Sequence, residues 1–165
     1  MAGPTRDNPV TQWIQEIKVP AALISYTYRT IQKRFAKDLA PYNIGWGHFA
    51  ILMSLYDEEG RSQDSLALSR GFDKTMIAKS VVKLEEEDLI RRQTDPEDKR
   101  VKRLYLTEKS RKLRPEMKRI GYGINDLLVK DFDEKESKVV LEYLRKIAMN
   151  ASELESPLST SPQDQ

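Results

Sequence analysis

The sequence contains no cysteine and a single histidine, His48. Without cysteine there is no disulfide, thiolate nucleophile, cysteine-based zinc site or thiol redox sensor. Glycine-rich phosphate loops and metal-ligand spacings are also missing. The apolar runs, such as residues 49–53, are far too short to cross a bilayer, and residues 1–10 hold no apolar signal segment. We therefore expect no enzyme, metal site, cofactor or membrane protein, and we expect a cytoplasmic location.

Charged side chains are abundant and unevenly distributed. They make up 33% of the 165 residues, against 39% for hydrophobic residues, and the formal net charge is +2. The last fifteen residues hold three acids and no lysine or arginine, which leaves +5 on the first 150. This composition is typical of a charged, mainly helical protein. The length suffices for one domain, or for a small domain with an oligomerisation element.

Turn residues and apolar periodicity divide the chain into segments. Pro20 suits the first turn of a long helix that runs to about residue 39, and residues 40–45 predict a turn. Asp133 and Glu136 fit a capping box for a last helix that ends near residue 150. The expected segments are a flexible arm at 1–10, helices and a turn at 11–45, a compact domain at 46–107, two helices at 108–150 and a disordered acidic tail at 151–165.

Two helices joined by a tight turn are predicted in the middle of the chain. Ser62 and Asp73 suit helix N-caps, and Gly71 suits the turn between a helix at about 62–69 and one that runs to about 87. On the second helix, one arc holds Ile77, Val81 and Leu84, and a roughly opposite arc holds Thr75, Met76, Lys79 and Lys83. The pattern fits a helix-turn-helix, and it fits an ordinary amphipathic surface helix equally well.

A basic β-hairpin is predicted directly after these helices. Residues 89–94 and 101–107 resemble two strands, and the charged loop DPEDKR at 95–100 lies between them. The segment 89–107 carries a net charge of +3. A basic hairpin after a basic-faced helix is the layout of a winged helix, in which the helix enters the major groove of DNA and the hairpin reaches the neighbouring backbone or minor groove.

Three segments of the sequence resemble one known family. LIRRQTDPEDKRVKRLYLTEKSR (89–111) is similar to the wing signature of the MarR family of transcription regulators, in which a D-P-x-D-x-R loop precedes a strand that ends in L-T-x-x-G. LAPYNIGWGHFAILMSL (39–55) resembles the start of the family's second helix, and SLALSRGFDKTMIAKSVVKLEEEDLI (65–90) resembles its helix-turn-helix. The resemblance covers about residues 20–150 in one register.

The resemblance implies a mainly α fold with a small β-hairpin wing. A winged helix-turn-helix domain at 46–107 is flanked by dimerisation helices at 11–45 and 108–150. The implied function is a homodimer that binds a pseudo-palindromic double-stranded DNA site, with half-sites about one DNA turn apart, and repression is the expected mode. Since the net charge is small, we expect weak non-specific DNA binding. One alternative stays open: a winged-helix module that binds a protein and not a specific DNA.

The resemblance also implies roles for individual residues. In the family a wing-tip arginine enters the minor groove and an aspartate two residues earlier holds it, which matches Arg100 and Asp98. The wing cations Lys99 and Lys102 are expected to face phosphates. The residues expected to read the major groove are Lys74, Thr75, Met76 and Lys79. Met76 replaces a commoner Ser or Thr, which favours apolar contact with a thymine methyl group, and Ser110 stands where the family usually has Gly.

Many family members bind small aromatic anions between the dimerisation helices and the winged domain, and then release DNA. Aromatic and cationic residues occur in the matching regions of this chain. The expected pocket residues are Tyr26, Arg29, Trp46 and His48. For each of them an ordinary packing or polar role remains open.

Overall fold

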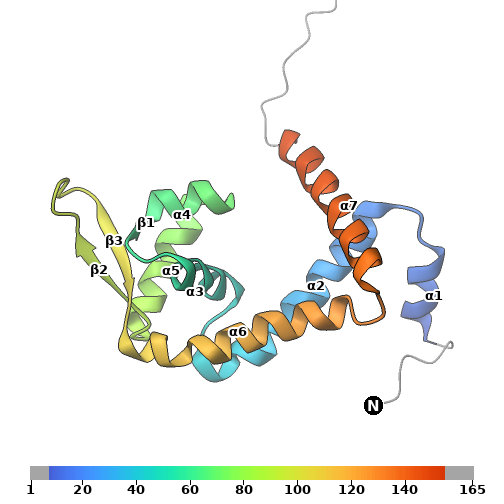
Figure 1. Ribbon diagram of the computed structural model, residues 1–165, viewed down its shortest axis with the longest axis horizontal. Helices are drawn as coiled ribbons and strands as arrows, with labels where there is room; N and C mark the ends of the chain where they lie inside the picture. Colours follow the sequence, from blue (N-terminus) through green and yellow to red (C-terminus); the bar gives the residue numbers. More distant parts are fainter. Residues whose placement is uncertain (1–7, 155–165) are drawn as a thin grey trace, which may run out of the picture. The chain divides into compact units, whose positions relative to one another are not determined.

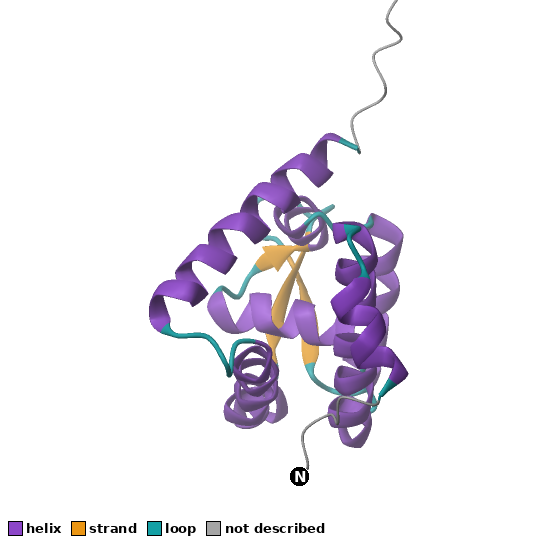
Figure 2. Cartoon of the chain, turned by 90° about the vertical axis from the view of Figure 1, so that its right-hand side faces the viewer, coloured by secondary structure: helices purple, strands orange, loops and turns teal. Residues whose placement is uncertain are grey.

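The computed structural model describes residues 8–154, apart from the side chain of Arg70. Helices make up most of this part, and the strands are confined to one small sheet (Figure 2). The chain divides into two compact units, one ending at Ile124 and the other beginning at Asn125. The expectation of a mainly α fold with a β wing is therefore confirmed.

The chain begins with two helices, α1 (Pro9–Glu16) and α2 (Pro20–Leu39). Each has proline in its first turn, where the missing N–H costs no hydrogen bond. Asn8 caps α1 by accepting a hydrogen bond from Val10 N at 2.9 Å. Residues 9 and 10, expected in a flexible arm, are thus helical, because this cap starts α1 early. Residues 1–7 of that arm lie outside the described residues.

A winged helix follows the short 3-10 turn η1 (Ala40–Tyr42). Its elements are α3 (Trp46–Asp57), β1 (Arg61–Ser62), α4 (Gln63–Arg70), α5 (Lys74–Glu86), β2 (Ile90–Thr94) and β3 (Lys102–Leu106). The sheet is antiparallel in the order β1-β3-β2 (Figure 1). The sequence predicted only the β2–β3 hairpin. Strand β1 was missed because two residues are too short to show an alternating pattern.

One hydrophobic core joins α2, α3, α4, α5 and the sheet. Its fully buried members include Leu39, Ile51, Leu52, Leu55, Leu66, Ile77, Val81, Leu84, Leu89 and Leu104. The rings of Phe35, Trp46 and Phe49 add an aromatic cluster between α2 and α3. The core holds α5 on the body of the winged helix along one of its faces.

Helix α6 (Glu108–Leu128) continues from β3 and is bonded to the loop that follows α3. Tyr56, 4% exposed, donates its hydroxyl hydrogen to the backbone oxygen of Ser110 at 2.8 Å. The Ser110 hydroxyl lies 3.1 Å from the same Tyr56 oxygen. The Arg111 guanidinium binds the Glu59 carboxylate with both terminal nitrogens. These bonds fix the start of α6 to the winged helix.

The second unit contains the end of α6 and helix α7 (Glu134–Glu153). The predicted capping box is present, because Asp133 and Glu136 each accept a hydrogen bond from the other's backbone N–H. Helix α7 extends three residues into the range 151–165 that was expected to be disordered; these residues continue its hydrogen-bonded turns. Residues 155–165 lie outside the described part. No described helix is long and apolar enough to cross a membrane.

Candidate nucleic-acid interface

The predicted helix-turn-helix is present with the caps that the sequence indicated. Ser62 accepts a hydrogen bond from Ser65 N at 3.1 Å, and Asp73 accepts one from Met76 N at 2.9 Å. Gly71 ends α4 in the left-handed conformation, with a φ of +62°. A side chain would strain this position. The turn therefore fixes α5 relative to α4 through one glycine and one capping carboxylate.

Helix α5 presents a polar face to solvent and buries the opposite one. Ile77, Val81 and Leu84 are completely buried, as the apolar arc predicted. Thr75 and Lys79 are exposed. Lys79 forms no hydrogen bond or ion pair with another residue whose side chain is described. This exposed face has the width and chemistry to approach base edges and phosphates in a major groove.

Met76, predicted on that exposed face, lies at its edge and is partly covered by the core. The side chain is half-buried and packs against the core. Its sulfur accepts a hydrogen bond from the Ser80 hydroxyl at 3.4 Å, and a Cβ built on Gly47 would lie 3.3 Å from it. Because Gly47 has no side chain, α3 leaves room for the thioether to turn inward. The predicted contact with a thymine methyl group stays a prediction.

The wing, defined as β2, β3 and the loop 95–101, is built on a buried carboxylate. Asp95 is 5% exposed and accepts hydrogen bonds from Glu97 N at 2.8 Å and Asp98 N at 3.1 Å. It also binds the Arg103 guanidinium. The two backbone N–H groups first, and Arg103 next, hold the pKa of Asp95 below its usual range. The carboxylate is therefore charged at neutral pH and fixes the loop.

Arg100 is held at the tip of the wing by Asp98. Arg100 Nε donates to Oδ1 of Asp98 at 3.0 Å, and Arg100 Nη2 donates to Oδ2 of the same carboxylate at 3.0 Å. The arginine side chain is nevertheless 91% exposed. The Arg100 guanidinium and then its backbone N–H lower the pKa of Asp98. A two-pronged contact of this kind fixes the plane and direction of the guanidinium, so Asp98 aims Arg100 outward.

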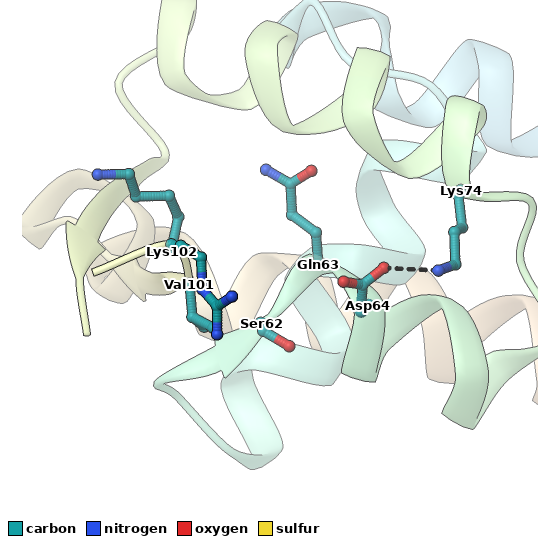
Figure 3. Close-up of a pocket in the computed structure, with 7 residues that line it drawn as sticks. Ser62, Gln63, Asp64, Lys74, Val101 and Lys102 are labelled. Atoms are coloured by element: carbon teal, nitrogen blue, oxygen red, sulfur yellow. Dashed lines mark ion pairs between the residues drawn. The ribbon is translucent and has the colours of Figure 1, made fainter. Parts of the chain in front are cut away.

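A cleft of about 300 Å³ separates the wing from the first turns of α4 and α5 (Figure 3). It is lined by Ser62, Gln63, Asp64, Lys74, Arg100, Val101 and Lys102. Lys102 donates to the Thr94 hydroxyl at 2.7 Å. Lys74 Nζ lies 3.0 Å from an oxygen of Asp64. A dashed line marks this ion pair in Figure 3. The structure thus brings predicted residues of the recognition helix and of the wing to the two sides of one cleft.

Sequence reasoning missed four residues of this arrangement. They are Gln63 and Asp64 at the start of α4, and Asp95 and Arg103 at the base of the wing. The position of Asp64 was only a weak indication of a role in the site, because the helix dipole favours an acid in the first turn of any helix. Only the fold brings Arg103, eight residues along the chain, to Asp95 across the hairpin.

The four predicted effector residues have local partners in the structure. Tyr26 packs against Trp13 of α1 in a tilted arrangement, with ring centroids 5.6 Å apart, and Arg29 donates to the Ser25 hydroxyl at 2.5 Å. Trp46 belongs to the aromatic cluster of the core. His48 Nδ1 accepts a hydrogen bond from Gly45 N at 2.8 Å at the start of α3. Effector binding by these residues stays a prediction.

A second groove, of about 500 Å³, joins the end of α5 to the first turns of α6. Its lining is Pro41, Tyr42, Asn43, Glu87, Leu89, Lys109, Lys112 and Leu113. Glu87 accepts hydrogen bonds from Asn43 and Lys83, and Lys109 donates to the Glu87 backbone oxygen at 2.5 Å. Lys112 makes no hydrogen bond or ion pair with another residue whose side chain is described. The groove therefore combines apolar walls with one uncompensated cation.

The fold and the cleft define a winged helix-turn-helix protein, and comparison with known proteins gives the family. A sequence model of the MarR family matches residues 44–102. The crystal structure of a MarR transcriptional regulator from Methanosarcina mazei Go1 is 36% identical, with a TM-score of 0.73. That match covers 81% of this chain and 96% of the other. The chain belongs to the MarR family of transcriptional regulators.

Two further comparisons agree with this assignment. An uncharacterized HTH-type transcriptional regulator, YybA of Bacillus subtilis, is 28% identical over 104 residues, which cover 63% of this chain and 69% of YybA. A putative MarR family regulator from Listeria monocytogenes, solved in complex with a 26mer DNA, is 24% identical with a TM-score of 0.76. That match covers 83% of this chain and 91% of the other, and at this identity it supports the fold alone.

The part of the chain that the structure describes holds no group of three or more His, Cys, Asp or Glu side chains that could bind a metal ion.

Proposed function

We propose that a homodimer of this chain binds a specific, pseudo-palindromic site on double-stranded DNA and represses transcription there. The observation that carries the proposal is Arg100, a 91% exposed guanidinium that a carboxylate holds rigidly at the tip of a wing. A narrow minor groove has an enhanced negative potential that attracts an inserted arginine. Pre-aiming the side chain reduces the conformational entropy that is lost on binding.

Helix α5 supplies the second part of the proposed interface. In this arrangement Thr75 and Lys79 face the major groove, and Lys74 at the first position of the helix meets the phosphate backbone. Lys99 and Lys102 of the wing face phosphates on the other side of the cleft. Phosphate contacts fix the register of a protein on the duplex, and side chains at base edges read the sequence. We leave Met76 out of the reading set because it packs inward.

The proposed dimerisation segments are 11–45 and 108–150. Helix α7 has no buried residue, yet it carries a stripe of large apolar side chains. The members of the stripe and their neighbours are Val139, Leu141, Tyr143, Leu144, Ile147 and Met149. Further exposed apolar residues lie on α1, on α2 and in the connection between them, including Val10, Trp13, Ile14, Val19, Ile24 and Tyr28. Contiguous apolar patches on a folded chain mark association surfaces. A two-fold dimer would then match a pseudo-palindromic site.

The alternative function, a winged-helix module that binds protein, predicts a different dependence on salt. Binding through phosphates releases counterions, so the logarithm of the association constant falls linearly with the logarithm of salt concentration. The exposed, unpaired Lys79 and Lys99 favour the DNA proposal, since neither bonds to another residue whose side chain is described. The proposal includes release of DNA by a small effector, because the groove beside Lys112 has the chemistry to accept a small anion with an apolar body.

The test of the central proposal is the substitution Arg100→Ala. A cognate duplex is first selected from a random DNA pool with the wild-type protein, and dissociation constants are then measured by fluorescence anisotropy at physiological salt. We expect Arg100→Ala to weaken binding about 10-fold or more, because a specific arginine contact contributes roughly 1–3 kcal/mol per half-site. The circular dichroism spectrum and the oligomeric state should not change.

The matched control is Lys33→Ala on α2. Lys33 is exposed and bonds to no other residue whose side chain is described, so this variant removes the same charge away from the cleft. An unchanged affinity of Arg100→Ala, or an equal loss with Lys33→Ala, contradicts the role of Arg100. If the wild-type protein selects no duplex from the pool, the DNA-binding proposal itself fails.

A further inference from the structure

Asp64 stands out in the cleft between the helices and the wing. It is the one acid among the described residues that line this cleft, and the lining also includes the cations Lys74, Arg100 and Lys102. Figure 3 shows its carboxylate directed at Lys74. Its carboxylate lies 3.0 Å from Lys74 Nζ, and both side chains are almost fully exposed, at 79% and 78%. A carboxylate here repels a phosphate that enters the cleft, and it occupies the lysine that would bind this phosphate.

The fold does not need this carboxylate. Ser62 already caps α4, since its hydroxyl accepts the hydrogen bond from Ser65 N. Asp64 forms no bond except its ion pair with Lys74 among the residues whose side chains are described. An ion pair between two exposed side chains contributes little to stability, because solvent screens it and ordering two side chains costs entropy. The position of Asp64 therefore has its main consequence for what enters the cleft.

We propose that Asp64 determines specificity by competing with DNA phosphate for Lys74. This inference rests on the proposed DNA-binding function and deepens it. On random DNA nearly all of the binding free energy is electrostatic, so a quenched Lys74 and a repelling carboxylate weaken the complex directly. On a cognate site the base contacts hold α5 in a position that turns the exposed Asp64 side chain away from the phosphates, so only the small cost of breaking its exposed ion pair with Lys74 remains. Asp64 thus increases the difference in affinity between cognate and random DNA.

The test compares wild-type protein with Asp64→Asn on the selected cognate duplex and on a random-sequence duplex across a salt series. We expect the variant to bind random DNA about 3- to 10-fold more tightly and cognate DNA less than about 2-fold more tightly. The slope of log K against log salt on random DNA should steepen by about 1 to 2 per dimer, as expected when each chain gains one phosphate contact. A purely structural change would not produce this added slope.

Two further variants isolate the cause. Asp38→Asn removes the same charge from an ion pair with Arg34 on α2, and it should leave binding to random DNA unchanged. In the Lys74→Gln background, Asp64→Asn should give a smaller gain on random DNA, because only the repulsion between the carboxylate and phosphate remains to be relieved. The inference is overturned if Asp64→Asn has no effect on random DNA, or if Asp38→Asn gives the same gain.

It is also overturned if the cognate duplex gains as much as the random one, or if the gain is undiminished without Lys74. These outcomes differ from failure of the proposed function, in which the wild-type protein binds neither duplex above background.

Discussion

Asp95 and Asp98 lie three residues apart in the loop of the wing and have different roles. Asp95 is buried at its base, where it holds two backbone N–H groups and Arg103. Asp98 is partly exposed and fixes only the tip of the loop, where it accepts hydrogen bonds from the backbone N–H and the guanidinium of Arg100. A loop that presents one arginine in a fixed direction needs both carboxylates. Asp98 orients the arginine side chain, and Asp95 fixes the backbone that carries it. Acids in a DNA-facing loop are thus compatible with DNA binding.

His48 gives a prediction about pH. Its pKa is lowered, first by burial and then by the nearby Lys83, and its Nδ1 accepts the hydrogen bond from Gly45 N only when unprotonated. The unfolded chain therefore binds a proton more readily, near pH 6.5. The stability that neutral His48 contributes is complete above this pH and is lost as pH falls through the lower pKa of the folded state.

The measurement is the free energy of unfolding in urea at pH 7.5 and pH 5.5, for the wild-type protein and for His48→Gln. Glutamine can accept the same hydrogen bond and does not titrate. The wild-type protein should lose more stability on acidification than the variant, by at most about 1.4 kcal/mol for the one pH unit below 6.5. The same loss in both proteins would show that His48 is not the titrating group.

At the scale of elements, α6 is coupled to α3 through one buried tyrosine. The hydroxyl of Tyr56 reaches both the backbone oxygen and the side chain of Ser110, which is completely buried. This contact gives a physical reason for serine at the position where the family usually has glycine. Burial raises the pKa of Tyr56, so the hydroxyl stays protonated and can donate.

We therefore expect Tyr56→Phe to lower the free energy of unfolding by about 1–2 kcal/mol. The variant loses a buried hydrogen bond and leaves the Ser110 hydroxyl poorly satisfied. Tyr122→Phe is the control, because Tyr122 lies on α6, the helix of Ser110, is 59% exposed, and its hydroxyl donates no hydrogen bond to another described residue. Urea unfolding followed by circular dichroism measures both. Equal midpoints for Tyr56→Phe and wild type would rule out a stabilising role for this bond.

The elements could be predicted where a short stretch of sequence carries its own signal. Ser62, Asp73 and Asp133 cap the helices that their positions indicated, and the wing loop places Asp98 against Arg100 as its motif implied. The rest depends on contacts between distant segments. The inward turn of Met76 depends on Gly47, which precedes it by 29 residues. Local patterns do not contain this information.

At the scale of the molecule, the described part of the chain exposes many large apolar side chains on its helices. Helix α7 has no buried residue although it carries a stripe of large apolar side chains. Its polar face carries charged pairs such as Lys138 with Glu134 and Lys146 with Glu142. Helices that are apolar along one stripe and charged along the other bury the stripe against a partner. A second copy of the chain supplies that partner in the proposed homodimer.

The stripe on α7 gives a prediction for the assembly. Leu144 lies near its centre and is 50% exposed, so Leu144→Glu would place an unpaired carboxylate in the proposed dimer interface. Burying such a charge is costly, and we expect the dimer dissociation constant to rise about 100-fold or more, equivalent to about 3 kcal/mol. Sedimentation equilibrium of the free protein measures the change.

Arg145→Gln changes the charge by the same amount at the next position, which points to the charged side of α7, and its dimer should persist. Because each monomer retains one wing and one recognition helix, Leu144→Glu should still contact DNA but should lose its preference for two half-sites over one. A variant that stays dimeric at micromolar concentration would remove α7 from the interface. A wild-type protein that is monomeric without DNA would remove the dimer, and with it the physical reason to expect a pseudo-palindromic site.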